Sequence, residues 1–454
     1  MRPFLLGDAV KATGGRFFGD AEALSSEITF VTSDSRTAAP GALFIAFKGA
    51  RADGHDFMAN CLAAGAVGCI SEREPASSAE MPCIVVPSSL QATGALAAWH
   101  RRRFDIPVIG ITGSVGKTTT KEMIASVLAQ KYNTHKTEKN FNNELGVPQT
   151  LLRLDDGHQV SVVEMGISDF GEMRRLTQMV HPTIAVFSVI GYSHLEYLGN
   201  RAGVLRAKAE IFEGMNAGGL AIVNGDDDLL NALETPVRKI TYGQQPHNDV
   251  VAENVHNLGM AGIQLTIRHA KGAFEANIPA FGAHMVYAAL AGAAVGLALG
   301  LTEAEIAGGI ARYHTVGDRA RVIDANGMTI ISDCYNANPN STSAALDSLG
   351  QLKGRKICIL GDMLELGEET AELHRQVGRR GVTQGIDQII ACGTLSRNTY
   401  EGALAEGGNA LYFANKSALL AELPELVRPG DRILVKASHS MAFEEIVSVL
   451  INEK

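Results

Sequence analysis

The feature that most constrains the fold of this chain is a glycine-rich turn between an apolar run and a helix-like run. The apolar run covers residues 107–109, the turn reads Thr112-Gly-Ser-Val-Gly-Lys-Thr-Thr119, and the helix-like run covers 121–130. A phosphate-binding loop requires this order, because glycine lets backbone N–H groups approach phosphate oxygens and the helix N-terminus adds partial positive charge. We therefore expect a nucleoside triphosphate to bind the loop residues Gly113, Ser114, Val115, Gly116, Lys117, Thr118 and Thr119.

Two side chains of the loop carry the expected chemistry. Lys117 would reach the β- and γ-phosphates, and the Thr118 hydroxyl would ligate Mg²⁺. The strict pattern G-x-x-x-x-G-K-[ST] is broken at Ile111, which stands where the first glycine is expected. The alternative is a glycine-rich turn with an incidental lysine, but the flanking strand and helix favour a phosphate loop.

Length and composition restrict the remaining possibilities. The chain has 454 residues, which is too long for one core and fits about three domains. Its net charge of −9 argues against nucleic acid or an anionic membrane as a partner. Six cysteines without a C-x-x-C pair indicate a reduced, cytoplasmic protein rather than a disulfide framework or a zinc site. The longest apolar run, 286–301, is too short to span a membrane, and we expect a soluble monomer.

The order of apolar and helical patterns predicts an α/β fold of three domains. Residues 1–103 form a small α/β N-terminal domain, 104–314 a central phosphate-loop domain with a parallel sheet, and 315–454 a C-terminal Rossmann-like domain. In the central domain, strands are predicted at 107–112, 160–164, 183–190 and 219–223, with helices at 118–131, 171–180 and 201–215. The basic cluster Arg101-Arg102-Arg103 is interpreted as the solvated end of an interdomain helix.

Polar residues follow the central strands where ligands bind an open parallel sheet, beyond the carboxyl ends. Glu164 ends the second strand, and His194 follows the third. A carboxylate and an imidazole beside the phosphate loop suit Mg²⁺, although either could be structural: a surface carboxylate or a hydrogen-bonded core histidine. Lys208, 14 residues after His194, lies on the apolar side of a predicted helix. By itself it is best interpreted as a lysine that snorkels to the surface.

Further motifs are shared with one family. Asn140-Phe-Asn-Asn143, Asp333-Cys-Tyr-Asn-Ala-Asn-Pro339 and Leu360-Gly-Asp-Met-Leu-Glu-Leu-Gly367 follow the phosphate loop, and Thr32-Ser-Asp-Ser-Arg36 and Asp53-Gly-His-Asp-Phe57 precede it. Over almost its whole length the chain resembles the ATP-dependent Mur ligases of peptidoglycan synthesis. The forms of these motifs, and the absence of a D-N-P-R motif, resemble the member of that family that adds D-alanyl-D-alanine.

This resemblance implies a function. The chain would use ATP and two Mg²⁺ ions to join D-alanyl-D-alanine to UDP-MurNAc-tripeptide through an acyl phosphate. That reaction is the final cytoplasmic step of peptidoglycan precursor synthesis, and so serves cell-wall biogenesis, cell shape and cell division. Whether the third residue of the acceptor is L-lysine or meso-diaminopimelate stays open.

The resemblance also implies residue roles. The catalytic lysine would be Lys117, and the metal ligands would be Thr118, Glu164, His194 and a carbamylated Lys208. Further nucleotide contacts would be Asn224, His284, Arg319 and Asp333. Uridine-nucleotide contacts would come from Ser33, Asp34, Ser35, Arg36, Lys48, Asp53 and His55. The remaining substrate contacts would be Asn142, Asn143, Tyr335, Asn336, Asn338, Ser438 and His439.

Some positions depart from the family pattern. Met285 and Ala288 replace two asparagines near the adenine, so His284 is expected to stack on the base instead. His439 replaces a more frequent arginine, and its charge would depend on pH. Two alternatives remain: another acid–amino acid ligase, such as folylpolyglutamate synthetase or another Mur step, and a nucleotide-binding regulatory subunit without ligase activity.

Overall fold

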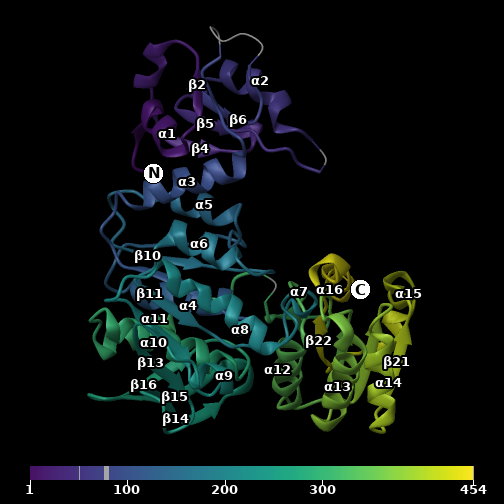
Figure 1. The fold of residues 1–454 in the computed structure, drawn as a ribbon. Coiled ribbons are helices and arrows are strands. Elements are labelled where there is room, and N and C mark those ends of the chain that lie inside the picture. The colour runs from purple at the N-terminus through teal and green to yellow at the C-terminus, as the bar shows by residue number, and fades with distance from the viewer. Residues whose placement is uncertain (51, 76–80, 318, 453–454) are drawn as a thin grey trace.

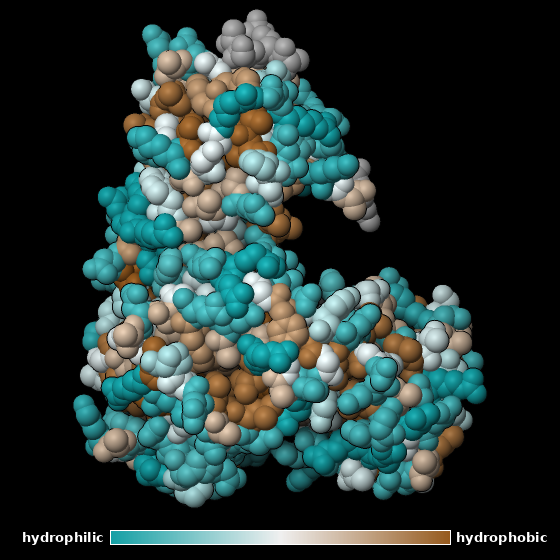
Figure 2. Space-filling view, in the orientation of Figure 1, coloured by the Kyte–Doolittle hydropathy of each residue, from teal (hydrophilic) through white to brown (hydrophobic). Residues whose placement is uncertain are grey.

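The chain folds into three α/β units that follow one another along a bent molecule (Figure 1). The computed structural model describes residues 1–50, 52–75, 81–317 and 319–452. Asp318, which stands where the family pattern has a glycine, lies outside the described residues. Each unit has its own sheet, and the space-filling surface is hollowed between the N-terminal and C-terminal units (Figure 2).

The N-terminal unit is built on a five-stranded sheet of order β2-β7-β6-β5-β4. All neighbours are parallel except β2 and β7. Its strands are β2 (Arg16–Phe18), β4 (Phe30–Thr32), β5 (Ala42–Ile45), β6 (Gly68–Ser71) and β7 (Cys83–Val85). β1 (Phe4–Leu5) pairs with β3 (Glu27–Ile28), and the helices are α1 (Leu6–Thr13), α2 (Met58–Ala63) and α3 (Ser89–Arg101).

The central unit contains a nine-stranded sheet of order β16-β15-β14-β13-β12-β11-β8-β10-β9. The seven strands β8 to β14 run parallel, and β15 and β16 extend the sheet as an antiparallel ribbon. Their bounds are β8 (Val108–Thr112), β9 (Thr134–Lys136), β10 (Val160–Glu164), β11 (Ile184–Phe187), β12 (Leu220–Asn224), β13 (Arg238–Gly243), β14 (Val250–Asn257), β15 (Ile263–His269) and β16 (Gly272–Ile278). β8 lies between β10 and β11, the point where the order of strands reverses, and such a point is where open α/β sheets bind ligands.

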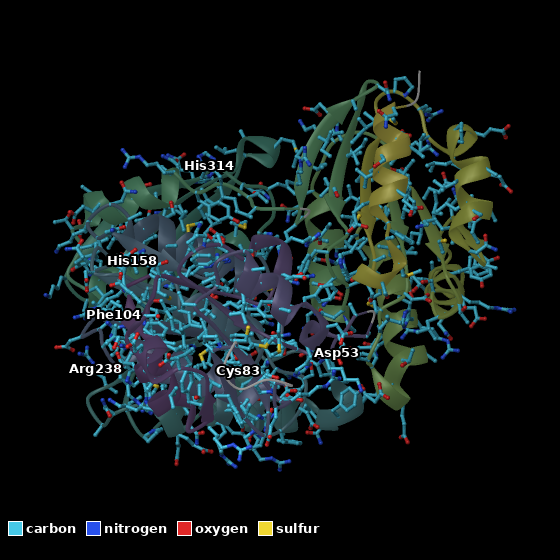
Figure 3. The ribbon with its side chains drawn as sticks, turned by 90° about the horizontal axis from the view of Figure 1, so that it is seen from above. Asp53, Cys83, Phe104, His158, Arg238 and His314 are labelled. Atoms are coloured by element: carbon cyan, nitrogen blue, oxygen red, sulfur yellow. The ribbon has the colours of Figure 1, made fainter. Side chains whose placement is uncertain are left out.

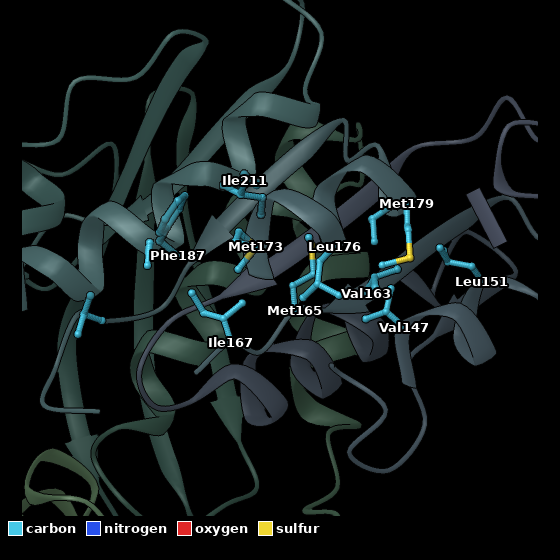
Figure 4. Close-up of a cluster of buried hydrophobic side chains, with 14 of the residues drawn as sticks. Val147, Leu151, Val163, Met165, Ile167, Met173, Leu176, Met179, Phe187 and Ile211 are labelled. Atoms are coloured by element: carbon cyan, nitrogen blue, oxygen red, sulfur yellow. The ribbon is translucent and has the colours of Figure 1, made fainter. Parts of the chain in front are cut away.

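Helices cover both faces of the central sheet. One face packs against α4 (Lys117–Leu128), α10 (Met285–Ala298) and α11 (Glu303–Ala311). The other packs against α5 (Gly146–Leu151), α6 (Glu172–Val180) and α8 (Arg201–Ala209). Figure 4 shows this second interface, in which Val163 and Met165 meet Met173 and Leu176 of α6. β8 and β10 are buried at every position, as strands covered on both faces must be.

The C-terminal unit has a six-stranded sheet of order β17-β18-β22-β19-β20-β21, parallel except for β17 against β18. The strands are β17 (Arg321–Ala325), β18 (Met328–Asp333), β19 (Lys356–Leu360), β20 (Gln388–Cys392), β21 (Ala410–Phe413) and β22 (Arg432–Lys436). The helices are α12 (Pro339–Gly350), α13 (Thr370–Thr383), α14 (Arg397–Ala405), α15 (Lys416–Leu426) and α16 (Glu444–Asn452).

Helix α3 joins the N-terminal unit to the central one. It packs against α1 on one side and against α5 and α6 on the other, and a Cβ at Gly94 would lie 2.9 Å from the Met179 sulfur. Arg101, at its end, is buried and donates to the carbonyls of Val180 and Phe104 at 3.1 and 2.7 Å. The interpretation of the basic cluster as a solvated helix end is therefore wrong for Arg101, because its guanidinium satisfies backbone carbonyls at this junction.

The long elements agree with the sequence patterns, and some short ones were missed. The predicted helix 201–215 divides into α8 and a 3₁₀ turn (Glu210–Gly214), and the predicted strand 183–190 ends at Phe187. The short N-terminal strands β1 to β4 and the strands β9, β17 and β21 were not predicted. Within the described residues, no helix is long and apolar enough to cross a membrane.

Candidate active site

The phosphate loop is held in place by the segment that follows β11. Ser114 N donates to Val189 O at 2.8 Å, and Ser188 Oγ donates to Val115 O at 2.6 Å. Gly113 has a φ of 147°, and a Cβ there would lie 1.9 Å from Ser188 Oγ. The loop conformation therefore requires glycine at 113, since both the backbone angle and the space exclude a side chain.

Lys117 begins α4 and folds back over the loop. Its Nζ donates to Gly113 O at 2.8 Å and to Ser114 O at 3.4 Å. Burial lowers the pKa of Lys117, and the nearby Glu164 carboxylate opposes that effect. The ammonium therefore lies over the loop, within reach of an anion bound there.

Glu164 ends β10 beside the loop and is fully buried. Its carboxylate accepts a hydrogen bond from Thr118 Oγ1 at 2.8 Å and one from Asn142 Nδ2 at 2.8 Å. Lys121 Nζ lies 4.0 Å from the same carboxylate. The structure thus brings together three predicted residues, Thr118, Asn142 and Glu164, around one buried carboxylate.

His194 lies beyond β11, immediately before the short helix α7 (Leu195–Leu198). Its backbone is left-handed, with a φ of 53°, and its Nδ1 is 2.6 Å from Oε2 of Glu365 in the C-terminal unit. Burial lowers the pKa of His194, Glu365 raises it, and Lys208 and Lys117 lower it further. Glu365 is therefore the one carboxylate that opposes the effects of burial and of the two lysines on the pKa of His194.

Three lysines are among the largest fully buried side chains: Lys121, Lys208 and Lys436. Lys121 Nζ is paired with Glu122 at 2.9 Å and donates to Thr137 O at 2.8 Å, and Lys436 Nζ is 2.5 Å from Asp333 Oδ2. In the part of the chain that the structure describes, Lys208 Nζ has no such acceptor. Burial and the Lys117 ammonium lower its pKa well below the usual value. The interpretation of Lys208 as a snorkelling surface lysine is therefore wrong.

The loop opens into a cavity of about 870 Å³ between the central and C-terminal units. Central residues on its wall include Ser114, Val115, Gly116, Lys117, Thr118, Thr119, Asn142, Asn143, Glu164, His194, Asn224 and His284. The C-terminal unit contributes Arg319, Asp333, Tyr335, Asn336 and Asn338. One cavity thus brings together most residues predicted to bind nucleotide and metal, whereas Gly113 and Lys208 are not part of its wall.

The C-terminal wall of the cavity is ordered by its own contacts. The Arg319 guanidinium lies 3.7 Å from the centre of the Tyr335 ring, and Asp333 is paired with Lys436. Asn338 caps α12 by accepting from Ser341 N at 2.8 Å. Ser438 and His439 do not line the cavity. Ser438 Oγ instead accepts from Leu364 N at 3.3 Å, and the His439 ring lies 5.6 Å from that of Tyr335.

The far end of the cavity is where the two missing asparagines would lie. Met285 and Ala288 line it with buried apolar side chains, next to His284 and Tyr287. Tyr287 OH donates to Asp226 Oδ2 at 3.0 Å. Within the described residues His284 Nδ1 has no hydrogen-bond partner, and a Cβ on Gly282 would lie 2.7 Å from it. This part of the wall therefore offers apolar surface beside His284.

The residues predicted to bind the uridine nucleotide lie on the N-terminal unit, outside the cavity. Asp34 accepts hydrogen bonds from the Arg36 guanidinium, which helps to lower the pKa of Asp34 to about 2. Ser33 and Ser35 flank Asp34 in the chain, and Lys48 is exposed. Viewed from above, Asp53 lies on the side of this unit toward the C-terminal unit (Figure 3).

His55 is already bonded on both ring nitrogens. Its Nδ1 is 2.6 Å from Asp53 Oδ1, and Nε2 accepts from Glu72 N at 3.1 Å. Glu72 in turn accepts from Ser89 N, at the start of α3. His55 therefore orders the loop rather than offering a free nitrogen to a ligand.

Sequence reasoning missed several residues of the site. Ser188, Lys121, Lys436 and Glu365 carry its main supporting contacts, and the sequence assigned a role to none of them, although Glu365 lies within the motif at 360–367. Lys121 follows the phosphate loop directly, and a lysine facing the sheet side of α4 was a usable signal. Glu365 could be found only from the way in which the units pack.

The donor set fits a magnesium ion that keeps much of its water. Within the described residues no three His, Cys, Asp or Glu side chains converge on one point. Glu164 and Thr118 offer oxygen atoms side by side, and Mg²⁺ is commonly held by one or two carboxylates together with substrate phosphates. The residues therefore fit a metal bound jointly with a nucleotide, not a site enclosed by protein.

Three family profiles cover most of the chain. They are described as "Mur ligase family, catalytic domain" at residues 27–101, "Mur ligase middle domain" at 111–296 and "Mur ligase, glutamate ligase domain" at 318–439. An *Escherichia coli* (strain K12) protein named UDP-N-acetylmuramoyl-tripeptide--D-alanyl-D-alanine ligase is 36% identical over 439 residues, which are 95% of this chain and 96% of that protein. The chain belongs to the Mur ligase family.

Other relatives agree over comparable lengths. A *Bacillus subtilis* (strain 168) protein of the same name is 37% identical and covers 93% of both chains. The crystal structure I of MurF from *Acinetobacter baumannii* superposes on this Mur ligase with a TM-score of 0.92, at 32% identity and over 100% of both chains. A *Thermotoga maritima* MurF ligase, solved in complex with ADP, gives a TM-score of 0.83 at 27% identity, over 93% of this chain and 97% of that one. The three-unit fold expected from the sequence is confirmed.

Proposed function

We propose that this Mur ligase uses ATP to join D-alanyl-D-alanine to UDP-MurNAc-tripeptide, the final cytoplasmic step of peptidoglycan precursor synthesis. The names of the relatives and the ADP bound to one solved relative support the substrates. The observation that carries the proposal is the cavity itself: the phosphate loop, a buried carboxylate and an imidazole face the start of the third unit across one space.

The acceptor carboxylate would attack the γ-phosphate, releasing ADP and forming an acyl phosphate. The amine of the dipeptide would then add to the acyl carbon, and phosphate would leave from the tetrahedral intermediate. Phosphorylation is needed because a free carboxylate has only oxide as a leaving group. Lys117 would place its positive charge against the transferring phosphoryl group, which is chiefly an electrostatic and positioning role.

Thr118, Glu164 and His194 would hold Mg²⁺ together with the triphosphate. The ion would neutralise charge on the phosphoryl oxygens. Lys208 is proposed to be carbamylated. A buried ammonium without an acceptor is costly, so the neutral amine is favoured, and a neutral amine is the form that reacts with CO₂. The product is an anion with two oxygen atoms, which would suit a second Mg²⁺.

The remaining roles follow the three units. We propose the bounds 1–103 for acceptor binding, 104–314 for ATP and 315–454 for the dipeptide side, with Arg319 on the phosphates and Asp333 on the ribose. Ser33 to Arg36, Lys48 and Asp53 would contact the uridine nucleotide. Asn224 and His284 would lie beside the nucleoside, while Asn142, Asn143, Asn336, Ser438 and His439 would line the path of the peptide. We also propose that the enzyme acts as a monomer.

The test is a ligation assay with ATP, Mg²⁺ and D-alanyl-D-alanine. Two acceptors are compared, UDP-MurNAc-tripeptide ending in L-lysine and the same compound ending in meso-diaminopimelate. ADP release that requires both acceptor and dipeptide, with a product of the ligated mass, supports the proposal. Release with an amino acid in place of the dipeptide would instead indicate another ligase of this fold. No release with either acceptor, by folded protein that binds ATP, would indicate a regulatory nucleotide-binding protein.

A further inference from the structure

The segment that carries His194 is held by the C-terminal unit at two points. Tyr192 N donates to Asn340 Oδ1 at 2.9 Å, and His194 Nδ1 lies 2.6 Å from Glu365 Oε2. Between these points α7 packs against the 3₁₀ turn Gly367–Glu369, and Leu195 and Leu366 are buried in one hydrophobic cluster. Figure 1 shows α7 at the junction of the two units. The position of His194 therefore depends on residues far away in the sequence.

Both members of the His194–Glu365 pair have a left-handed backbone. The φ angles are 53° for His194 and 61° for Glu365, a conformation that costs about 1–2 kcal/mol for a residue with a side chain. Strained residues of this kind persist where the surrounding structure fixes them, and they cluster at functional sites. Here two such residues, one from each unit, point their side chains at each other.

The two nitrogens of His194 have different surroundings. Nδ1 is buried at an ion-pair distance of 2.6 Å from Glu365 Oε2 but is not aligned for a hydrogen bond, whereas Nε2 makes neither an ion pair nor a hydrogen bond within the described residues, and His194 lines the cavity. A metal-binding histidine usually donates its other ring N–H to a carboxylate or a carbonyl, which fixes the tautomer and the orientation of the ring. At His194 a carboxylate supplied by another unit lies within reach of such a contact, 2.6 Å from Nδ1.

We propose that Glu365 is a positioning residue for His194: it accepts the Nδ1 proton, directs Nε2 into the cavity, and so makes the C-terminal unit part of the metal site. This inference rests on the proposed metal role of His194. Its consequence is that the nucleotide-bound protein has its full affinity for the metal only while the C-terminal unit is docked on α7.

The test measures binding of Mn²⁺, as a probe for Mg²⁺, to the whole protein saturated with ADP, by electron paramagnetic resonance of free Mn²⁺. The variants are Glu365→Ala and Glu365→Gln, with His194→Ala as the reference. Glu368→Ala is the matched control, because Glu368 is an exposed carboxylate in the next turn with no ion pair among the described residues. Loss of a supporting residue of this kind typically weakens metal binding about 10–100-fold.

We expect Glu365→Ala to weaken Mn²⁺ binding within that range, Glu365→Gln to weaken it less, and Glu368→Ala to leave it unchanged. In ¹⁵N spectra, the histidine resonance that His194→Ala removes should show a protonated Nδ1 in the wild type and should lose that signature in Glu365→Ala. A merely structural role would not change the tautomer.

Two other results would overturn the inference in different ways. If Mn²⁺ binding falls in His194→Ala but stays within twofold of wild type in Glu365→Ala, Glu365 does not position the ligand and the proposed function stands. If His194→Ala itself binds Mn²⁺ normally, the metal assignment of His194 fails and this inference fails with it.

Discussion

The two buried lysines of the central unit should respond in opposite ways to the same substitution. Lys208 and Lys121 are both about 1% exposed, and both lie near the phosphate loop. Lys121 has Glu122 and Thr137 O as partners, whereas Lys208 has none among the described residues. Methionine has a similar volume and no charge, so Lys208→Met should stabilise the protein and Lys121→Met should destabilise it.

The expected magnitudes come from these contacts. Replacing a buried polar amine that lacks a partner by an apolar side chain of similar volume should raise the free energy of unfolding by about 2 kcal/mol. Removing Lys121 leaves Glu122 and a carbonyl without their partner, which should lower it by about 3 kcal/mol; Glu122 keeps a second contact with Lys136. In a unit of this size the midpoint temperatures should change by about +5 °C and −8 °C.

The assay is thermal unfolding of the two variants and the wild type in CO₂-free buffer, so that the comparison is made with the free amine of Lys208. Ligation is measured on the same samples after bicarbonate is restored. Lys208→Met should be more stable than wild type and nearly inactive. A Lys208→Met variant that is less stable than wild type would refute the reasoning, because Lys208 would then have a stabilising partner in the folded protein. Active Lys208→Met would refute the proposed carbamate.

Four further predictions follow from the structure. Lys117→Ala should reduce ligation about 10³-fold or more in a steady-state assay, while circular dichroism shows an intact fold. Lys208→Ala should be nearly inactive and partly restored by acetate or formate, and an unmodified Lys208 in the mass spectrum of active, Mg²⁺-loaded enzyme would contradict it. Burial lowers the pKa of His100 from 6.5 to about 4, so the neutral form stabilises the fold above pH 6.5; about 2 kcal/mol should be lost by pH 5, and urea unfolding should show a smaller loss in His100→Gln. Small-angle scattering should show a smaller radius of gyration with an ATP analogue and UDP-MurNAc-tripeptide bound, and an unchanged radius in a sample that turns over would contradict closure of the hollow in Figure 2.

The parts of the site that the sequence predicted are those encoded by neighbours along the chain. The phosphate loop and the strand ending at Glu164 each depend on a few consecutive residues, whose spacing is visible in the sequence. Glu365 and Lys436 depend on contacts across units or across a sheet, and the spacing of residues does not reveal these. The sequence also suggested that His55 was available to a ligand, because nothing local shows that Asp53 and Glu72 already bond both nitrogens.

The missed strands have a related cause. β9, β17 and β21 lie at or next to sheet edges, where one side of the strand needs no apolar cover, so their sequences lack the continuous hydrophobic run of β8 or β10. The helix pattern alone also misplaced Lys208 at the surface. A lysine among apolar residues normally reaches the surface, and only the packing of α8 shows that this one does not.

Helix α3 has a consequence for chimeric enzymes made by exchanging the N-terminal unit between relatives. The helix belongs to the first unit by sequence, but its outer surface is shaped to α5 and α6, with Gly94 against Met179 and Arg101 under the carbonyl of Val180. In a chimera that takes residues 1–103 from a relative, the relative's helix would pack against α5 and α6 of this chain. A larger side chain at position 94, or the absence of an arginine at position 101, would then disturb the contacts at this junction. Successful exchange should require the facing residues of α5 and α6 to be transplanted together with the unit.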